Sequence, residues 1–301
     1  MKETGKLIRC ITDDGLILGA AIDSTAIVRR MKEIHGTSPA VTIALGQLLT
    51  GASLMGNKLK EKGASLTLRV EGGGGAGMLL AVSDSEGNVR GLAGHPQFVN
   101  DGEFSVSDAV GTDGLMAVIK DFGEGTPYTA QVKVTTGSIA QELTNYHAVS
   151  EQVPTVLSLG VKLDENGEVV SAGGYIIQLL PLADEREIER IESTLATVKS
   201  VSAMFAAGFT LEDMCKAALD GFTLEFFEET EVSYKCYCSR EKCISAFKTL
   251  SEDDLLELSR EEKPAEVCCQ FCDAKRYFSR EELLAIAAEI RSDKEEGRTA
   301  L

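Results

Sequence analysis

The C-terminal part of the chain carries two closely spaced cysteine pairs, Cys236-Tyr237-Cys238 and Cys269-Gln270-Phe271-Cys272. Each pair is close enough in sequence to place two sulfurs on one ion. The segment between the pairs has the pattern of helix and turn, which allows the chain to fold back and bring them together. Pairs with this spacing usually bind one zinc ion through four thiolates. The same pairs could instead close into two disulfides, so the segment has the chemistry of a switch.

The chain contains four further cysteines, whose roles also have to be assigned. Cys243 and Cys268 are alternative ligands, and Cys268 adjoins Cys269. Adjacent cysteines rarely bind one ion without strain, and we expect Cys269 to be the ligand because Cys-x-x-Cys forms a tight zinc turn. Cys10 and Cys215 are expected to be buried apolar thiols. The three histidines all lie in the first half of the chain, so a local site is all-sulfur or includes a carboxylate.

A metal at this position would contribute to folding. The acidic C-terminal segment is too short to bury a large core. Structural zinc contributes an apparent ~10–16 kcal/mol in small domains at neutral pH, so removal of the metal should unfold the segment. Oxidation would also remove it, because a disulfide sulfur is no longer a thiolate ligand.

Composition narrows the class of protein. The chain has 301 residues, 44% of them hydrophobic, and a formal net charge of −17. An acidic chain repels phosphate backbones, which argues against general nucleic-acid binding. We see no unbroken apolar run of the length that a membrane helix needs, and residues 1–6 carry an early acid rather than the pattern of a signal peptide. We therefore expect a cytoplasmic protein, in which thiols stay reduced.

The first 181 residues alternate between strand-like and helix-like segments. A turn is expected at Asp13-Asp14-Gly15. Ser24 and Ser38-Pro39 are predicted to begin two helices. The first is stopped by Gly36, and the second is long, apolar and mostly buried. A meander of strands with few inserted helices favours an α+β fold over a parallel α/β sheet. The expected strands are residues 7–10, 16–22, 65–70, 77–82, 88–92, 115–122, 128–135 and 174–180.

The character of the sequence changes after Pro181. We expect three parts: an N-terminal core domain (1–181), an amphipathic helical linker (182–232) and a small C-terminal zinc-binding domain (233–301). Apolar residues recur at helical spacing in the linker, behind a capping-box pattern at Asp184 and Glu187. The same capping pattern occurs at Ser251 with Asp254 and at Ser279 with Glu282.

Two other motifs are weaker. Residues 72–77 match G-x-G-x-x-G after a strand, but a second strand follows where a phosphate-binding helix should begin, so we predict a flexible turn. No Walker A loop occurs, which argues against an ATP-driven machine. No serine or cysteine arrangement suggests a catalytic role for the histidines, which are expected at surface or capping positions; they are His35, His95 and His147.

Segments spread along the chain match those of one known family. Near the N-terminus they include His35-Gly36-Thr37-Ser38-Pro39, and near the C-terminus they include both cysteine pairs. The other matching segments are residues 44–50, 87–91, 127–132, 150–154, 172–181 and 239–241. Through these segments the chain resembles, across its length, the redox-regulated chaperone family of heat shock protein 33.

This resemblance implies an ATP-independent holding chaperone rather than an enzyme. The reduced form would bind one zinc through Cys236, Cys238, Cys269 and Cys272 and be inactive. Peroxide at raised temperature, or hypochlorite, would form the disulfides Cys236–Cys238 and Cys269–Cys272 and release the zinc. The linker would then unfold, and the exposed apolar surface would bind unfolded client proteins. The active form would be a homodimer, with residues 1–181 as the dimerisation domain. The additional thiols Cys243 and Cys268 could exchange with these disulfides.

Two other functional classes are compatible with the cysteines. A thiol–disulfide oxidoreductase would use Cys269 and Cys272, although this pair lies far from any thioredoxin-like βαβ start. A zinc-stabilised nucleic-acid binder is disfavoured by the net charge. Catalytic reduction of a disulfide substrate and salt-dependent nucleic-acid binding, respectively, would distinguish them from a chaperone.

Overall fold

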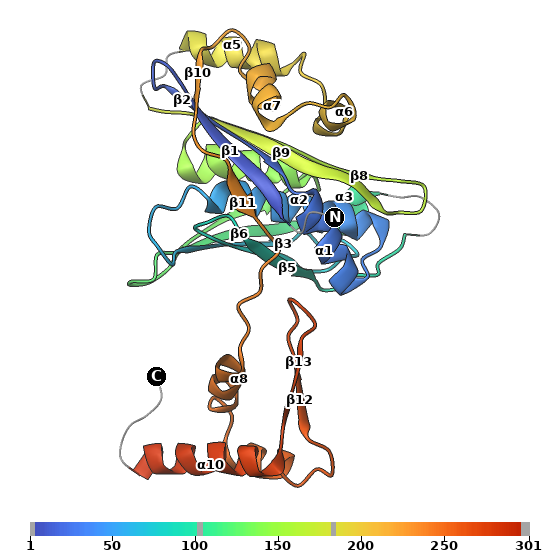
Figure 1. The fold of residues 1–301 in the computed structure, drawn as a ribbon, viewed down its shortest axis with the longest axis vertical. Coiled ribbons are helices and arrows are strands. Elements are labelled where there is room, and N and C mark those ends of the chain that lie inside the picture. Colours follow the sequence, from blue (N-terminus) through green and yellow to red (C-terminus); the bar gives the residue numbers. More distant parts are fainter. Residues whose placement is uncertain (1–3, 101–104, 182–184, 296–301) are drawn as a thin grey trace. The chain divides into compact units, whose positions relative to one another are not determined.

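The computed structural model describes residues 4–100, 105–181 and 185–295. The chain divides into two compact units, residues 1–235 and 236–301, which are described separately here (Figure 1). The first unit combines two antiparallel sheets with helices, which confirms the predicted α+β class.

One sheet of the first unit contains strands from both ends of that unit. Its order is β10-β1-β2-β9-β8, and β11 also pairs with β1. The strands are β1 (Gly5–Thr12), β2 (Ile17–Asp23), β8 (Thr155–Leu163), β9 (Val169–Leu179), β10 (Leu224–Phe226) and β11 (Thr230–Val232). The predicted turn at Asp13-Asp14-Gly15 joins β1 to β2, and Gly15 takes the positive φ of 71° that such a turn requires.

The other sheet is a meander with the order β5-β4-β3-β6-β7. All of its strands were expected from the sequence, with ends displaced by one or two residues. They are β3 (Ser65–Glu71), β4 (Leu79–Asp84), β5 (Val89–Ala93), β6 (Gly114–Asp121) and β7 (Tyr128–Val134).

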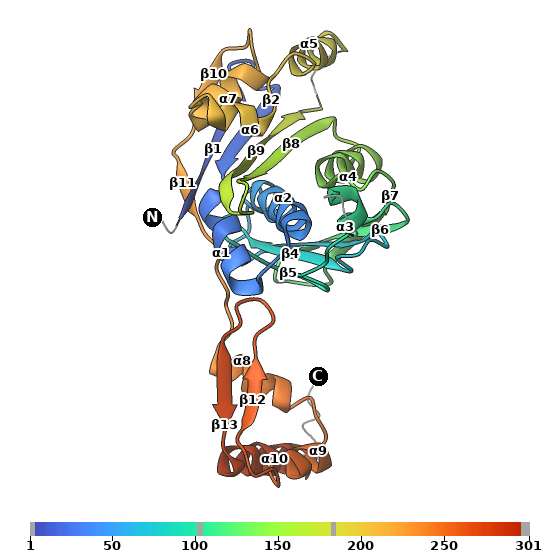
Figure 2. The same cartoon turned by 90° about the vertical axis from the view of Figure 1, so that its right-hand side faces the viewer.

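A long helix, α2 (Pro39–Gly56), fills the space between the two sheets (Figure 2). Ser38 and Pro39 occupy the N-cap and first helical position, as predicted. The helix is long and apolar enough to cross a membrane by composition, but 83% of its apolar window is buried inside the unit. It is therefore the central core helix of this fold.

The first sheet is buried on both faces, because successive side chains along its strands enter two different apolar clusters. Leu7, Ile22 and Ile176 face the core around α2. Their neighbours Ile8 and Ile177 point to the opposite face, where they pack against a second group of helices. These helices are α5 (Glu185–Leu195), α6 (Val201–Ala206) and α7 (Leu211–Ala218), which cover this face of the sheet (Figure 1). Successive strand residues alternate between faces, so both faces of the sheet are apolar.

The segment expected to be a helical linker is only partly helical. Its helical part is α5 to α7, whereas residues 224–226 and 230–232 are strands and not the predicted helix. These strands form because β1 offers unpaired backbone groups at the edge of the sheet, with pairs such as Cys10 with Phe226 and Leu7 with Thr230. The capping box expected at Asp184 and Glu187 lies outside the described residues.

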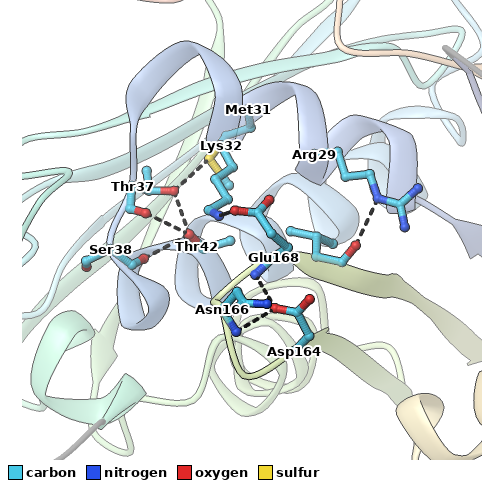
Figure 3. A network of polar contacts seen from close by, with 10 residues as sticks. Arg29, Met31, Lys32, Thr37, Ser38, Thr42, Asp164, Asn166 and Glu168 are labelled. Atoms are coloured by element: carbon cyan, nitrogen blue, oxygen red, sulfur yellow. Dashed lines mark hydrogen bonds and ion pairs between the residues drawn. The ribbon is translucent and has the colours of Figure 1, made fainter. Parts of the chain in front are cut away.

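The remaining helices of the first unit are α1 (Thr25–His35), α3 (Val106–Val110), α4 (Ile139–Tyr146) and a π-helical turn (His147–Glu151). Helix α1 ends at Gly36 in the left-handed conformation, as predicted. Figure 3 shows how α1 is held to the β8–β9 turn: Arg29 donates to the carbonyl of Val169 at 2.9 Å, and Lys32 pairs with Glu168. Ser24 caps no N–H group of α1; its hydroxyl instead bonds with Thr50 of α2 at 2.7 Å.

Candidate metal centre

The second unit is small and has a thin core. It contains α8 (Arg240–Phe247), α9 (Glu252–Leu258), the hairpin of β12 (Ala265–Cys268) and β13 (Lys275–Phe278), and α10 (Arg280–Glu295). The capping boxes predicted at Ser251 with Asp254 and at Ser279 with Glu282 are both present. The buried apolar side chains of this unit are Phe247, Leu255, Phe278, Leu283, Ile286, Ala287 and Ile290. So few buried side chains give limited stability without a further cross-link.

Local backbone structure positions the two cysteine pairs. Cys236 and Cys238 lie on the extended segment before α8, whose N-cap is Ser239. Cys269 and Cys272 lie in the turn between β12 and β13. In that turn the carbonyl of Cys269 accepts the backbone N–H groups of Cys272 (3.3 Å) and Asp273 (2.8 Å). Asp273 takes a positive φ of 56°, which closes the turn and brings both sulfurs to one side.

The four sulfur atoms form one cluster. They all lie within 4.8 Å of one another, with 3.6 Å between Cys236 and Cys269 and 3.5 Å between Cys238 and Cys272. Tetrahedral zinc with Zn–S bonds of about 2.3 Å requires sulfurs about 3.8 Å apart. All four cysteines have free thiols and are half-buried. The donor set and its spacing therefore fit a closed four-thiolate metal site.

A neighbouring cation favours thiolate at this cluster. Arg276 donates to the carbonyl of Cys238 at 3.2 Å and approaches its sulfur at 3.8 Å. Burial opposes ionisation of Cys238, but hydrogen bonds from Cys272 and Arg276 lower its pKa to about 7. Burial raises the pKa of Cys236 and of Cys272. A metal ion that binds here must therefore displace protons from part of the cluster.

The structure places the other two cysteines of this unit away from the cluster. Cys268 is exposed, and its sulfur contacts a carboxylate oxygen of Asp273 at 3.0 Å. Cys243 lies on α8 and packs against the apolar core of the unit. The cluster thus contains Cys269 rather than the adjacent Cys268.

The glycine-rich segment 72–77 is a packed loop, not a phosphate cradle. Gly74 and Gly75 donate their N–H groups to the carbonyls of Val110 (3.2 Å) and Asp108 (2.9 Å). A Cβ on Gly74 would lie 2.4 Å from the backbone of Gly111, and one on Gly75 would overlap the ring of Phe98. Close backbone packing, rather than the expected flexibility, explains these glycines.

The histidines were expected at surface or capping positions, and His147 is the C-cap residue of α4, but it is buried rather than on the surface. Its side chain is 3% exposed, and Nδ1 lies 3.0 Å from a carboxylate oxygen of Glu151 in the π-helical turn. A single histidine on a polar stretch gave no sequence signal of burial. Cys10 and Cys215 are buried, as expected. Their burial in one apolar cluster was not foreseen, because 204 residues separate them in the sequence.

Comparisons with known proteins find similar proteins over nearly the whole length of the chain. The sequence model of the family described as Hsp33 protein matches residues 5–279. The 33 kDa chaperonin of Clostridioides difficile is 38% identical over 288 residues, covering 94% of this chain and 99% of that protein. The 33 kDa chaperonin of Acetivibrio thermocellus is 36% identical, with coverage of 96% and 98%. The crystal structure of the 33 kDa chaperonin (heat shock protein 33 homolog) from Thermotoga maritima aligns with a TM-score of 0.87 at 30% identity, over 97% of this chain and 100% of that one.

Proposed function

The chain belongs to the Hsp33 protein family, and from this membership we propose that it is a redox-regulated, ATP-independent holdase whose activity is controlled by the cysteine cluster. The family is one of non-enzymatic chaperones, so the oxidoreductase alternative built on Cys269 and Cys272 is set aside. We further propose a cytoplasmic location, because the mechanism needs thiols that are reduced until stress occurs.

In the proposed inactive state, Cys236, Cys238, Cys269 and Cys272 hold one zinc ion per chain. The metal supplies a cross-link between the segment before α8 and the β12–β13 turn. The support for this is the sulfur spacing of 3.5 and 3.6 Å between the two pairs and the all-sulfur donor set. Since the core of this unit is thin, the cross-link determines whether residues 236–301 stay folded.

In the proposed activation step, each cysteine pair gives up two electrons and forms one disulfide. Peroxide or hypochlorite accepts the electrons and is reduced to water or chloride. The expected bonds are Cys236–Cys238 and Cys269–Cys272. Disulfide sulfur is not a thiolate ligand, so the metal site is lost and the second unit unfolds.

The observation that best carries the proposed function is the doubly buried sheet of the first unit. In the described part of the chain, one face is covered by elements of the linker segment, and that interface is apolar: Ile17, Tyr175 and Ile177 on the sheet belong to the same buried cluster as Met204 and Met214. If α5 to α7 leave the sheet, both surfaces become exposed and can bind unfolded clients. The residues Ile8, Ile17, Tyr175, Ile177 and Leu179 would form the sheet side of that surface.

The two events are connected through the chain itself. Lys235 is the last residue of the first unit, and its N–H donates to the carbonyl of Val89 at 2.8 Å. The next residue is the first expected ligand, Cys236. Unfolding of the second unit therefore begins four residues after the end of β11, the edge strand that follows the linker helices and β10. We propose that the exposed first unit then forms the active homodimer.

Zinc content, free thiols and holdase activity should be measured on the same samples. The reduced protein is expected to contain one zinc per chain and to leave a thermally aggregating client unprotected. After peroxide at raised temperature it should contain no zinc, have four fewer free thiols and suppress aggregation. Protection of the client by protein that retains its zinc, or no protection after complete zinc loss, would contradict the proposal.

A further inference from the structure

Two thiols outside the metal centre meet at the interface between the sheet and the linker helices. Cys10 lies on β1 and Cys215 on α7, and both are fully buried in the same apolar cluster. The residue paired with Cys10 on β2 is Gly19. A Cβ at Gly19 would lie 2.7 Å from the sulfur of Cys10 and 3.3 Å from Leu219, so glycine is needed to make room for the sulfur.

Helix α7 packs on β1 and β2, so both thiols lie at one buried interface. The neighbouring Cys215 lowers the pKa of Cys10, whereas Cys10, together with burial, raises the pKa of Cys215. The interface therefore holds one thiol that more readily becomes a nucleophile and a second, neighbouring thiol that can react with it. Neither thiol has a role in the metal centre.

We propose that Cys10 and Cys215 are a second oxidisable pair, whose disulfide fastens helix α7 to strand β1 and keeps the linker on the sheet. This inference rests on the proposed function, in which the linker must leave the sheet. Oxidation at this pair then opposes oxidation at the metal centre: one disulfide pair releases the linker and the other retains it.

The chemistry balances with a peroxide as oxidant. The Cys10 thiolate attacks one oxygen of hydrogen peroxide, the O–O bond breaks, and the products are a sulfenic acid and, after protonation, water. The sulfur of Cys215 then attacks the sulfenic sulfur, the S–O bond breaks, and a second water leaves. Overall two thiols lose two electrons and two protons, and one molecule of peroxide becomes two molecules of water.

Burial sets the rate of this step. Because both thiols are fully buried, the oxidant reaches them when α7 opens locally. The half-buried cluster of the second unit is more accessible. Brief oxidation should therefore act first on the metal centre and release the linker. Prolonged oxidation should form the bond between Cys10 and Cys215 in those molecules whose linker returns to the sheet.

The experiment uses the full-length, zinc-loaded protein treated with hydrogen peroxide for increasing times. Remaining thiols are alkylated, the protein is digested without reduction, and peptides joined through Cys10 and Cys215 are quantified by mass spectrometry. In parallel, limited proteolysis measures the rate of cleavage within residues 188–218. The control variants are Cys215→Ala and Cys10→Ala, with Cys243→Ala as a matched removal of one thiol elsewhere.

For each protein the readout is the ratio of linker cleavage rates before and after prolonged oxidation, so that any packing defect of a variant cancels. We expect the linked peptide in the wild type and in Cys243→Ala, with linker cleavage at least about tenfold slower than in oxidised Cys215→Ala. Reduction with dithiothreitol should abolish the difference.

The proposal is overturned if the linked peptide does not form, even in mild denaturant that opens α7. It is also overturned if the peptide forms and the linker of the wild type is cut as fast as that of Cys215→Ala. Failure of the proposed function has a different signature. In that case oxidised, zinc-free Cys215→Ala would not protect clients, whatever the peptide map of the wild type shows.

Discussion

The sulfur of Cys238 lies 3.5 Å from the sulfur of Cys272, although the two residues are 34 positions apart in the chain. This distance is too long for a disulfide, which joins sulfurs at about 2.05 Å, and suits two ligands of one tetrahedral ion. The contact joins the segment before α8 to the β12–β13 turn. The resemblance implies that oxidation joins neighbours within each pair, so this contact between pairs would belong to the reduced state alone.

The first prediction concerns loss of one expected ligand. Cys272→Ser should reduce the zinc content from one per chain to near zero and unfold the second unit, because structural zinc contributes an apparent ~10–16 kcal/mol in small domains. Zinc assay and amide hydrogen exchange of residues 236–292 measure both effects. Cys243→Ser, which removes a thiol outside the cluster, should keep the metal. A folded, zinc-loaded Cys272→Ser protein would show that the cluster is not the site.

The sequence predicted the local elements that carry strong periodic or capping signals. Helix α2 was predicted from Ser38-Pro39 and its continuous apolar residues, and the two capping boxes of the second unit were found by spacing alone. Strand β8 was missed, because Ser158 and Gly160 interrupt its alternation and its pairing with β9 determines its conformation. Strands β10 and β11 were missed for the same reason: the free edge of β1, not the local sequence, makes them strands.

The candidate site was predictable to a similar degree. Ligand spacing indicated which four cysteines could share an ion, because the spacing is local and chemically specific. The hydrogen bonds of Arg276 to Cys238 and the shared burial of Cys10 and Cys215 depend on tertiary packing. A single sequence contains no signal for such contacts, since the partners are 38 and 205 positions apart.

The second prediction concerns the apolar interface that would hold the linker down. Met214 lies on α7 and is fully buried against the sheet. Met214→Glu buries an unpaired charge, which should detach α7 and give a protein that protects clients without oxidation and with its zinc still bound. Met214→Leu, which conserves volume and polarity, should remain inactive when reduced. Aggregation assays on reduced samples, with zinc measured alongside, compare the two variants. An inactive Met214→Glu protein with an exposed linker would separate linker release from client binding.

The third prediction concerns a half-buried lysine of the first unit. Lys58 donates to Gln178 at 2.7 Å, and burial lowers its pKa to about 8. Below pH 8 the lysine is charged in both states, so the folded state bears the full desolvation penalty. Between about pH 8 and 10.4 the unfolded state binds more protons, so the free energy of unfolding rises with pH, by at most about 3 kcal/mol.

This pH dependence can be isolated with a matched pair of variants. Lys58→Met should flatten the rise between pH 8 and 10.4 and make the first unit more stable at pH 7. Lys60→Met, at an exposed position two residues on, should behave as the wild type does. Urea denaturation followed by circular dichroism at several pH values gives the comparison. Parallel curves for the wild type and Lys58→Met would mean that Lys58 is solvated in the folded protein.

The fourth prediction concerns Glu151, at the end of the π-helical turn. Its carboxylate accepts the hydroxyl of Tyr146 at 2.7 Å, contacts His147 Nδ1 at 3.0 Å, and forms an ion pair with Lys120. Burial opposes ionisation of Glu151, but these three donors lower its pKa well below the ordinary range. The π-helical register matters here, because it places a carboxylate within reach of two side chains from the preceding turn.

A depressed carboxyl pKa contributes stability above the unfolded value of about 4.3, and that contribution is lost as the pH falls below it. Glu151→Gln should therefore lower the free energy of unfolding of the first unit by about 2–3 kcal/mol at pH 7, because it leaves Lys120 partly buried without its counter-charge. The same variant should lose less stability than the wild type between pH 4 and pH 2. Glu165→Gln, at an exposed position, should alter neither quantity. Equal stability of Glu151→Gln and the wild type at pH 7, measured by urea denaturation, would mean that desolvation of these groups cancels their attraction and that the turn is held by packing around Tyr146.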